Sequence, residues 1–124
     1  MNVVDSSAWL EYFAGTEQAE PFVEAIEATD KLIVPVIVLH EVFKKIILTS
    51  GEDAALTAIA HLRQGLVVEI DEDTALNAVK NSIEHALPLA DSLIFAIALK
   101  YKATLYTQDR HFENIPGVRY FPKG

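Results

Sequence analysis

The alternation of apolar and polar segments along the chain predicts strands and helices in turn. Short apolar or β-branched runs between turn residues indicate buried strands, whereas apolar residues three and four positions apart indicate helices. We expect strands at residues 1–4, 31–34, 66–70, 103–106 and 118–121. We expect helices at residues 8–14, 17–29, 36–49, 52–63 and 74–86, and a sixth that contains the uncharged run 93–99. Pro21 suits a first helical turn, so the second helix should begin near Glu20.

This order of elements predicts an α/β fold. Strands that alternate with helices form a parallel sheet with helices on both faces, here a three-layer α/β/α sandwich with a mainly parallel central sheet. No linker, repeat or low-complexity segment interrupts the pattern. We therefore expect residues 1–124 to form a single domain.

Composition narrows the class of protein. Hydrophobic residues make up 51% and charged residues 23%, as in folded globular proteins. The longest apolar runs, 32–39 and 93–99, fall short of the roughly 20 residues that span a bilayer, so we expect no membrane segment. The N-terminus lacks the features of a signal peptide. The absence of cysteine excludes disulfides and thiolate metal sites, and suits the cytoplasm, where we expect the protein to act.

The net charge of −8 argues against binding nucleic acid through a basic surface, because phosphate contacts dominate that affinity. A nucleic-acid function would need some carboxylates to hold cations. Two divalent ions would change the net charge from −8 to −4 and would remove the repulsion between the site and a phosphate.

Four carboxylates are expected at one edge of the sheet. Ligands of open α/β sheets bind at the carboxyl ends of the strands. Asp5 directly follows the first strand, and Asp109 comes shortly after the fourth. Asp91 begins the helix that leads into the fourth strand, and Glu41 lies in the first half of the helix after the second. All four can converge on the same edge.

Each carboxylate also has an ordinary structural explanation. Asp5 suits the N-cap of a helix. Asp91 could cap its helix or lie in the first turn, near the positive end of the helix dipole. Asp109 could open a turn. Glu41 has Lys45 four residues later, a pair that modestly supports an exposed helix.

Taken together, the four acids are harder to explain structurally. Buried carboxylates repel one another and are costly unless they are paired or bind metal. Few cations are near them in sequence: Lys44, Lys45, Arg110 and His111. Oxygen-rich sites suit Mg²⁺ or Mn²⁺. A pair of such ions can activate water and stabilise the leaving oxygen of a phosphodiester.

The motifs resemble those of the PIN-domain family, and most closely its VapC type, the toxin half of prokaryotic toxin–antitoxin pairs. The resemblance covers the whole chain. It rests on the order and spacing of four segments: Asp5-Ser6-Ser7 after the first strand, Glu41 in the third helix, Ala90-Asp91-Ser92-Leu93-Ile94, and Leu105-Tyr106-Thr107-Gln108-Asp109-Arg110-His111-Phe112.

The resemblance implies a metal-dependent endoribonuclease. Asp5, Glu41, Asp91 and Asp109 match the acidic quartet that holds the metal and performs catalysis, with Mg²⁺ or Mn²⁺ as cofactor. The Thr107 and Ser6 hydroxyl groups would orient carboxylates or a water molecule. The implied partners are an RNA substrate, a cognate antitoxin held by the first helices, and a second copy of the chain in a homodimer.

The remaining polar residues are less informative. Arg110 is the candidate for a phosphate contact, although a solvated loop arginine explains it equally well. His40 and His111 fit surface or cap positions better than ligand positions, because neither has a second histidine at ligand spacing. His61 and His85 are expected in polar helical surroundings without a role.

Two other functions stay open. A receiver-type signalling domain also binds Mg²⁺ at a sheet edge. It would require paired acids after the first strand and a lysine after the last main strand, where this chain has a single Asp5 and Thr107-Gln108-Asp109. The other is a binding module that has kept the fold without catalysis.

Overall fold

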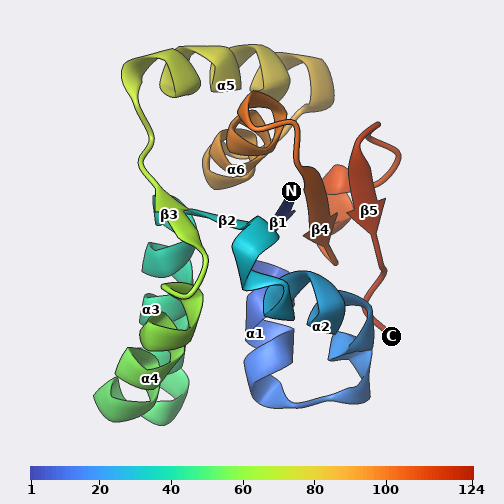
Figure 1. The fold of residues 1–124 in the computed structure, drawn as a ribbon. Helices are drawn as coiled ribbons and strands as arrows, with labels where there is room; N and C mark the ends of the chain where they lie inside the picture. Colours follow the sequence, from blue (N-terminus) through green and yellow to red (C-terminus); the bar gives the residue numbers. More distant parts are fainter.

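The computed structural model describes all residues 1–124 and contains one five-stranded parallel sheet. The strands lie in the order β3-β2-β1-β4-β5 (Figure 1). They are β1 Asn2–Val4, β2 Leu32–Pro35, β3 Leu66–Val68, β4 Thr104–Thr107 and β5 Val118–Tyr120. The helices are α1 Ser6–Ala14, α2 Glu20–Glu27, α3 Val36–Ser50, α4 Glu52–Leu62, α5 Glu72–His85 and α6 Leu89–Lys100. Single 3₁₀ turns occur at Glu17–Ala19, Thr29–Lys31 and Arg110–Phe112.

Helices cover the sheet on both sides, which confirms the predicted α/β/α fold. Figure 1 shows α1 to α4 below the sheet and α5 and α6 above it. Right-handed crossovers explain this division. The connections from β1 to β2 and from β2 to β3 progress toward one edge of the sheet, whereas the connection from β3 to β4 returns in the opposite direction, so its helices lie on the other face. Every strand pair is parallel, so all strands end at the same edge.

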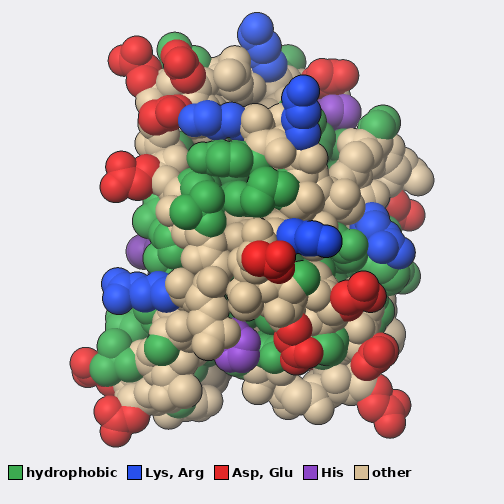
Figure 2. Space-filling view, in the orientation of Figure 1, with side chains coloured by type: hydrophobic (Ala, Val, Ile, Leu, Met, Phe, Trp, Pro, Cys, Tyr) green, Lys and Arg blue, Asp and Glu red, His purple; other side chains and the backbone are tan.

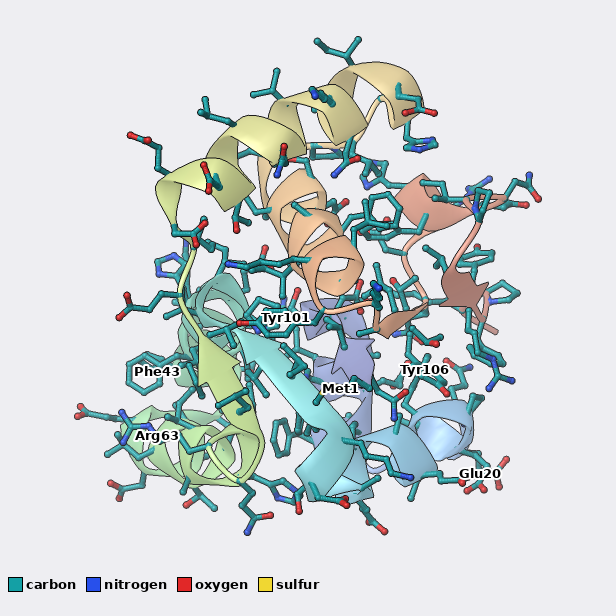
Figure 3. All side chains as sticks on the ribbon, turned by 45° about the horizontal axis from the view of Figure 1, so that its top comes forward. Met1, Glu20, Phe43, Arg63, Tyr101 and Tyr106 are labelled. Atoms are coloured by element: carbon teal, nitrogen blue, oxygen red, sulfur yellow. The ribbon has the colours of Figure 1, made fainter.

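Helix α6 is the most deeply buried helix. Five consecutive residues are 5% exposed or less: Ile94, Phe95, Ala96, Ile97 and Ala98. The helix contacts both β1 and β4, the two central strands. Since α6 runs back across the sheet into β4, its N-terminus lies at the carboxyl edge of the strands. Side chains from both faces fill the space between layers, while Glu20 and Arg63 point outward on opposite sides (Figure 3).

Several element boundaries differ from the predictions. The expected helix 17–29 is a 3₁₀ turn followed by α2, which begins at Glu20 with Pro21 in its first turn, as expected. Strand β3 ends at Val68, two residues early. Within α3, the apolar residue Ile47 is 38% exposed. The buried stripe of α3 runs through Val38, Val42 and Ile46, and Ile47 lies about 100° around the helix from it.

Two histidines lie in aromatic rather than polar surroundings, so the expectation for them was wrong. The His61 ring packs edge-on against Trp9, Tyr12 and Phe13, with centroid separations of 5.4–6.0 Å. The His85 ring packs edge-on against Phe95 at 5.8 Å. Helical spacing alone did not show that α1 would lie beside α4, which brings His61 to its aromatic neighbours, or that α5 would lie against α6, which brings His85 to Phe95.

No single helix is long and apolar enough to cross a membrane. Only α5 and α6 taken together reach the required length and composition, and they are bent by 112° at their junction.

Candidate metal centre

The ends of β1 and β4 bring Asp5 and Thr107 together. Val4 pairs with Tyr106, and the Asp5 backbone N–H donates to the Tyr106 carbonyl at 3.1 Å, which extends the ladder by one residue. The Thr107 hydroxyl then donates to Asp5 Oδ2 at 2.5 Å. These partners are 102 residues apart in sequence. Both side chains are buried, Asp5 at 2% exposure and Thr107 fully.

Asp5 is also the N-cap of α1. Its Oδ1 accepts hydrogen bonds from the Ala8 backbone N–H at 3.1 Å and from the Ser7 hydroxyl at 2.7 Å. The capping role expected from the sequence is therefore present, and it coexists with a position at the candidate site. One carboxylate is fixed by three donors, so its orientation is set before any ligand binds.

Asp91 and Asp109 meet across the edge of the sheet. Asp91 lies in the first turn of α6, and Asp109 caps the 3₁₀ turn after β4. The Asp109 backbone N–H donates to Thr107 Oγ1 at 2.9 Å. Thr107 therefore ties the backbone of Asp109 and the carboxylate of Asp5 to one hydroxyl group.

His111 lies between these two carboxylates. Its Nδ1 is 3.0 Å from Asp91 Oδ2 and 2.9 Å from Asp109 Oδ1. The sequence favoured a surface or cap position for this residue, and its backbone N–H does donate to Asp109 Oδ1 at 2.9 Å. The imidazole contact with both carboxylates was not foreseen, because it depends on the fold of the turn at Arg110–Phe112.

The electrostatics show an excess of negative charge at this edge. Burial raises the pKa of Asp5 from 3.8 to about 6, although its hydrogen bonds, led by that from Thr107, oppose the rise. Burial also raises the pKa of Asp91 to about 7, and repulsion from Asp109 and Asp5 adds to the effect. His111 opposes this rise by its contact with Asp91. A bound cation would favour the ionised form of both groups.

Glu41 lies beside this group and contacts it indirectly. Its Oε1 accepts a hydrogen bond from the Ser6 hydroxyl at 2.8 Å, and Ser6 directly follows Asp5. Its side chain is half-buried. The structure thus brings Asp5, Asp91 and Asp109 together, and connects the fourth predicted carboxylate through Ser6.

Two residues with direct contacts were missed by sequence reasoning. Ser7 donates to Asp5, whereas the sequence singled out only Ser6. Gln108 is 5% exposed, and its side-chain Nε2 donates to the Ser7 carbonyl and to Glu11 Oε1. The signal for Ser7 was present in the Asp5-Ser6-Ser7 motif, but the helix geometry was needed to choose between the serines.

The residues present fit a divalent cation. Ligand atoms of Asp91, Asp109 and His111 lie within 4.8 Å of one another. Carboxylate oxygens suit Mg²⁺ and Mn²⁺. Burial, with repulsion between the carboxylates, raises the pKa values of Asp5 and Asp91, and a bound cation would oppose both effects.

Known proteins share this fold. The family model described as "PIN domain" matches residues 3–118. A toxin–antitoxin complex from Klebsiella pneumoniae has a chain 25% identical, with a TM-score of 0.82 and coverage of 99% of this chain and 100% of that chain. A search of curated proteins gives no significant match.

More distant structures share the fold. VapC20 from Mycobacterium tuberculosis, a toxin that cleaves the sarcin–ricin loop, is 20% identical with a TM-score of 0.73, over 88% of this chain and 90% of that chain. DNA-bound VapBC from Salmonella typhimurium is 19% identical with a TM-score of 0.75, over 98% and 96% of the two chains.

The parallel sheet and the acidic residues that converge at its carboxyl edge define an α/β protein with a candidate metal centre. This chain belongs to the PIN-domain family, as its motifs predicted. Its structural neighbours include a toxin–antitoxin complex, the toxin VapC20 and a VapBC complex.

Proposed function

We propose that this protein is a Mg²⁺- or Mn²⁺-dependent endoribonuclease and the toxin of a type II, VapBC-type toxin–antitoxin pair. The observation that carries the proposal is the convergence of Asp5, Asp91 and Asp109 at one sheet edge, where burial and mutual repulsion raise two of their pKa values. The family and the toxin–antitoxin neighbours support it.

In this proposal Asp91 and Asp109 hold the metal, with Asp5 and Glu41 completing the acidic quartet and His111 as a further candidate ligand. When bound, divalent ions would offset the charge of the scissile phosphate and promote ionisation of the attacking water. The protein's own residues fix the geometry: Thr107 and Ser7 hold the Asp5 carboxylate, and Ser6 holds Glu41. Arg110, exposed beside Asp109, can contact a phosphate of the substrate.

A receiver-type domain is a weaker candidate on topology. Receiver domains have the strand order 2-1-3-4-5. The order here is 3-2-1-4-5, which places the first strand beside the fourth and lets Asp5 meet Thr107. The candidate site is therefore formed between the ends of the first and fourth strands, which are not neighbours in the receiver strand order.

The proposed partners follow from the same assignment. An antitoxin that inserts an arginine or lysine would be attracted to the acidic edge, and would offset the charge that a metal otherwise balances. The protein would form a homodimer and act on RNA in the cytoplasm. Sequencing of RNA 5′ ends after induced expression would identify the transcript that is cleaved.

The test is metal-dependent cleavage by the purified protein. We expect RNA cleavage with Mg²⁺ or Mn²⁺, none with EDTA, and restoration when metal is returned. Asp91→Asn keeps the shape of the side chain but removes its charge, so it should stay folded by circular dichroism and lose activity by about 100-fold or more. Cleavage that is unchanged by EDTA, or full activity in folded Asp91→Asn, would contradict the proposal.

A further inference from the structure

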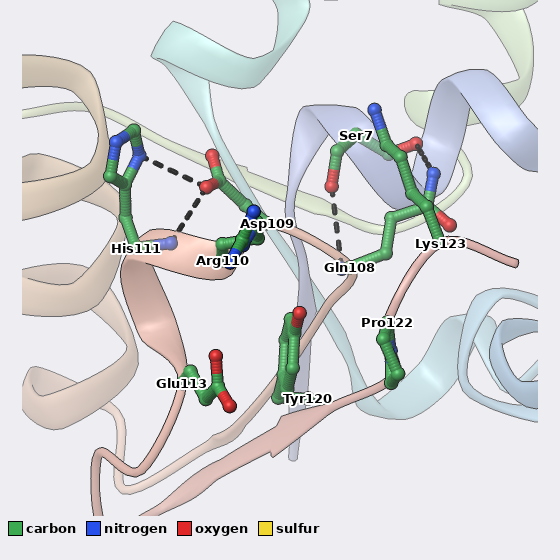
Figure 4. Close-up of a pocket in the computed structure, with 9 residues that line it drawn as sticks. All are labelled: Ser7, Gln108, Asp109, Arg110, His111, Glu113, Tyr120, Pro122 and Lys123. Atoms are coloured by element: carbon green, nitrogen blue, oxygen red, sulfur yellow. Dashed lines mark hydrogen bonds and ion pairs between the residues drawn. The ribbon is translucent and has the colours of Figure 1, made fainter.

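A polar pocket opens directly beside the candidate metal centre. Its volume is about 750 Å³, within the range of ligand pockets. It shares Ser7, Asp109 and His111 with the centre and continues onto β5 and the segment after it, through Tyr120, Pro122 and Lys123 (Figure 4). Tyr120, Pro122 and Lys123 are not part of the acidic quartet, so the metal centre does not account for this part of the pocket.

The pocket of this acidic protein is lined by two cationic and two acidic side chains: Arg110 and Lys123, and Asp109 and Glu113. On the face shown in Figure 2, lysine and arginine are interspersed among acidic side chains rather than gathered in a basic patch. Arg110 and Lys123 both line the pocket, and neither forms an ion pair with the protein. Both charges are therefore available to a phosphate bound in the pocket.

An aromatic ring, that of Tyr120, also lines the pocket. Figure 4 shows Tyr120 with its hydroxyl group directed toward Arg110 and Gln108, Lys123 to one side and Glu113 to the other. Tyr120 is half-buried. A ring beside cations is the combination that binds single-stranded nucleic acid, since bases stack on aromatic faces while cations contact the backbone.

The ring is held at a fixed position relative to the metal centre. Tyr120 pairs with Thr107 in the sheet, and the Phe121 backbone N–H donates to the Thr107 carbonyl at 2.9 Å. The neighbouring Arg119 packs over the rings of Tyr106 and Phe121, on the other side of the strand. The residue that orients Asp5 therefore also pairs with the residue that bears the ring.

We infer that this pocket is a nucleotide subsite for single-stranded RNA, in which one base stacks on Tyr120 and the adjacent phosphates contact Arg110 and Lys123. The inference rests on the proposed function and specifies how substrate is held. The carboxylates of Glu113 and Asp109 repel a phosphate, so the RNA backbone lies toward Lys123. The Glu113 carboxylate is then free to accept a hydrogen bond from a base N–H.

Kinetics of variants test the subsite separately from the chemistry. Tyr120→Ala should raise KM for a single-stranded oligoribonucleotide by between about fivefold and 100-fold, the range expected for one lost stack, with kcat changed by less than about twofold. Tyr120→Phe keeps the ring and should behave like the unmodified protein. Lys123→Gln should raise KM and weaken its dependence on salt, whereas Lys31→Gln, at the opposite edge of the sheet, should not.

A second measurement uses the unmodified protein, so it stands even if Tyr120→Ala fails to fold. An oligoribonucleotide carrying 5-iodouridine, irradiated with the protein in Ca²⁺, should cross-link to the peptide containing Tyr120, as identified by mass spectrometry. Calorimetric titration with Mn²⁺ tests whether the variant keeps its metal centre. Tyr120→Ala and the unmodified protein should bind Mn²⁺ with the same affinity.

The outcomes separate the two proposals. Cleavage with an unchanged KM in folded Tyr120→Ala, or cross-links confined to other peptides, would overturn the subsite and leave the nuclease intact. Cross-linking at Tyr120 without metal-dependent cleavage would support the RNA subsite and overturn the nuclease. Absence of any cross-link would overturn the subsite.

Discussion

At the scale of single residues, Thr107 connects the parts of the candidate site. Its hydroxyl donates to the Asp5 carboxylate and accepts from the Asp109 backbone N–H. Its own backbone pairs with β5. A small polar side chain thus fixes the distance between the ends of two strands, which is the distance that a metal site depends on.

Replacing Thr107 by valine tests this role with little change of shape. Thr107→Val removes the donor to Asp5, so the pKa of Asp5 should rise further, because that hydrogen bond lowers it. We expect metal affinity and kcat/KM to fall by about 10- to 100-fold. Thr107→Ser retains the hydroxyl group and should keep most of the activity. Equal metal affinity in the valine and serine variants would contradict the assignment.

At the scale of elements, α6 determines where Asp91 lies. The helix is buried between α5 and the central strands, so its first turn is held at the carboxyl edge of the sheet. Asp91 projects from that turn toward Asp109, whereas a loop would leave its position variable. The apolar run that the sequence shows is therefore the support of one half of the site.

Two proline substitutions in α6 distinguish its interior from its start. Ala96→Pro removes a backbone hydrogen bond and introduces a clash in the middle of a buried helix, at a cost of about 3 kcal/mol or more. We expect loss of the cooperative urea transition. Leu89→Pro is the matched control, since Leu89 is the first helical residue and is 77% exposed. It should unfold like the unmodified protein, and comparable loss in both variants would contradict this account of α6.

At the scale of the whole molecule, the acidic edge couples stability to pH and metal. The folded-state pKa values of Asp5 and Asp91 lie above the unfolded value of 3.8, so the folded protein binds more protons between about pH 4 and pH 7. The free energy of unfolding contributed by these groups therefore falls as pH rises through this range. A hydrogen bond from Lys100 lowers the pKa of Asp71, so the stability that Asp71 contributes is lost only at more acidic pH.

Urea unfolding in EDTA should show this dependence. For Asp5 alone, a folded pKa of about 6 instead of 3.8 corresponds to roughly 3 kcal/mol lost between about pH 4 and pH 8. Asp5→Asn keeps an N-cap but does not titrate there, so its stability should depend less on pH. Mg²⁺ should stabilise the unmodified protein more at about pH 8 than at about pH 5, since it binds ionised carboxylates. Identical pH dependence of the two proteins in EDTA would contradict the assignment of Asp5.

Much of the fold could be predicted because its causes are local. Short apolar runs, cap residues such as Asp5 and turn residues such as Gly15, which ends α1 with a φ of 70°, specify elements through interactions within a few positions. Alternation then implies a parallel sheet. The placement of Asp5 and Asp109 after their strands was therefore evident from the order of residues, as was the N-terminal position of Asp91.

By itself, then, the sequence determined the α/β architecture, the family and the carboxylates available at one edge. Only the tertiary structure decided which side chains touch: Thr107 with Asp5, His111 between Asp91 and Asp109, and Ser6 with Glu41. It also placed Tyr120 beside Thr107 and so formed the pocket. The physical reason is that strand order and register join residues up to 102 positions apart, and no local pattern encodes such a distance.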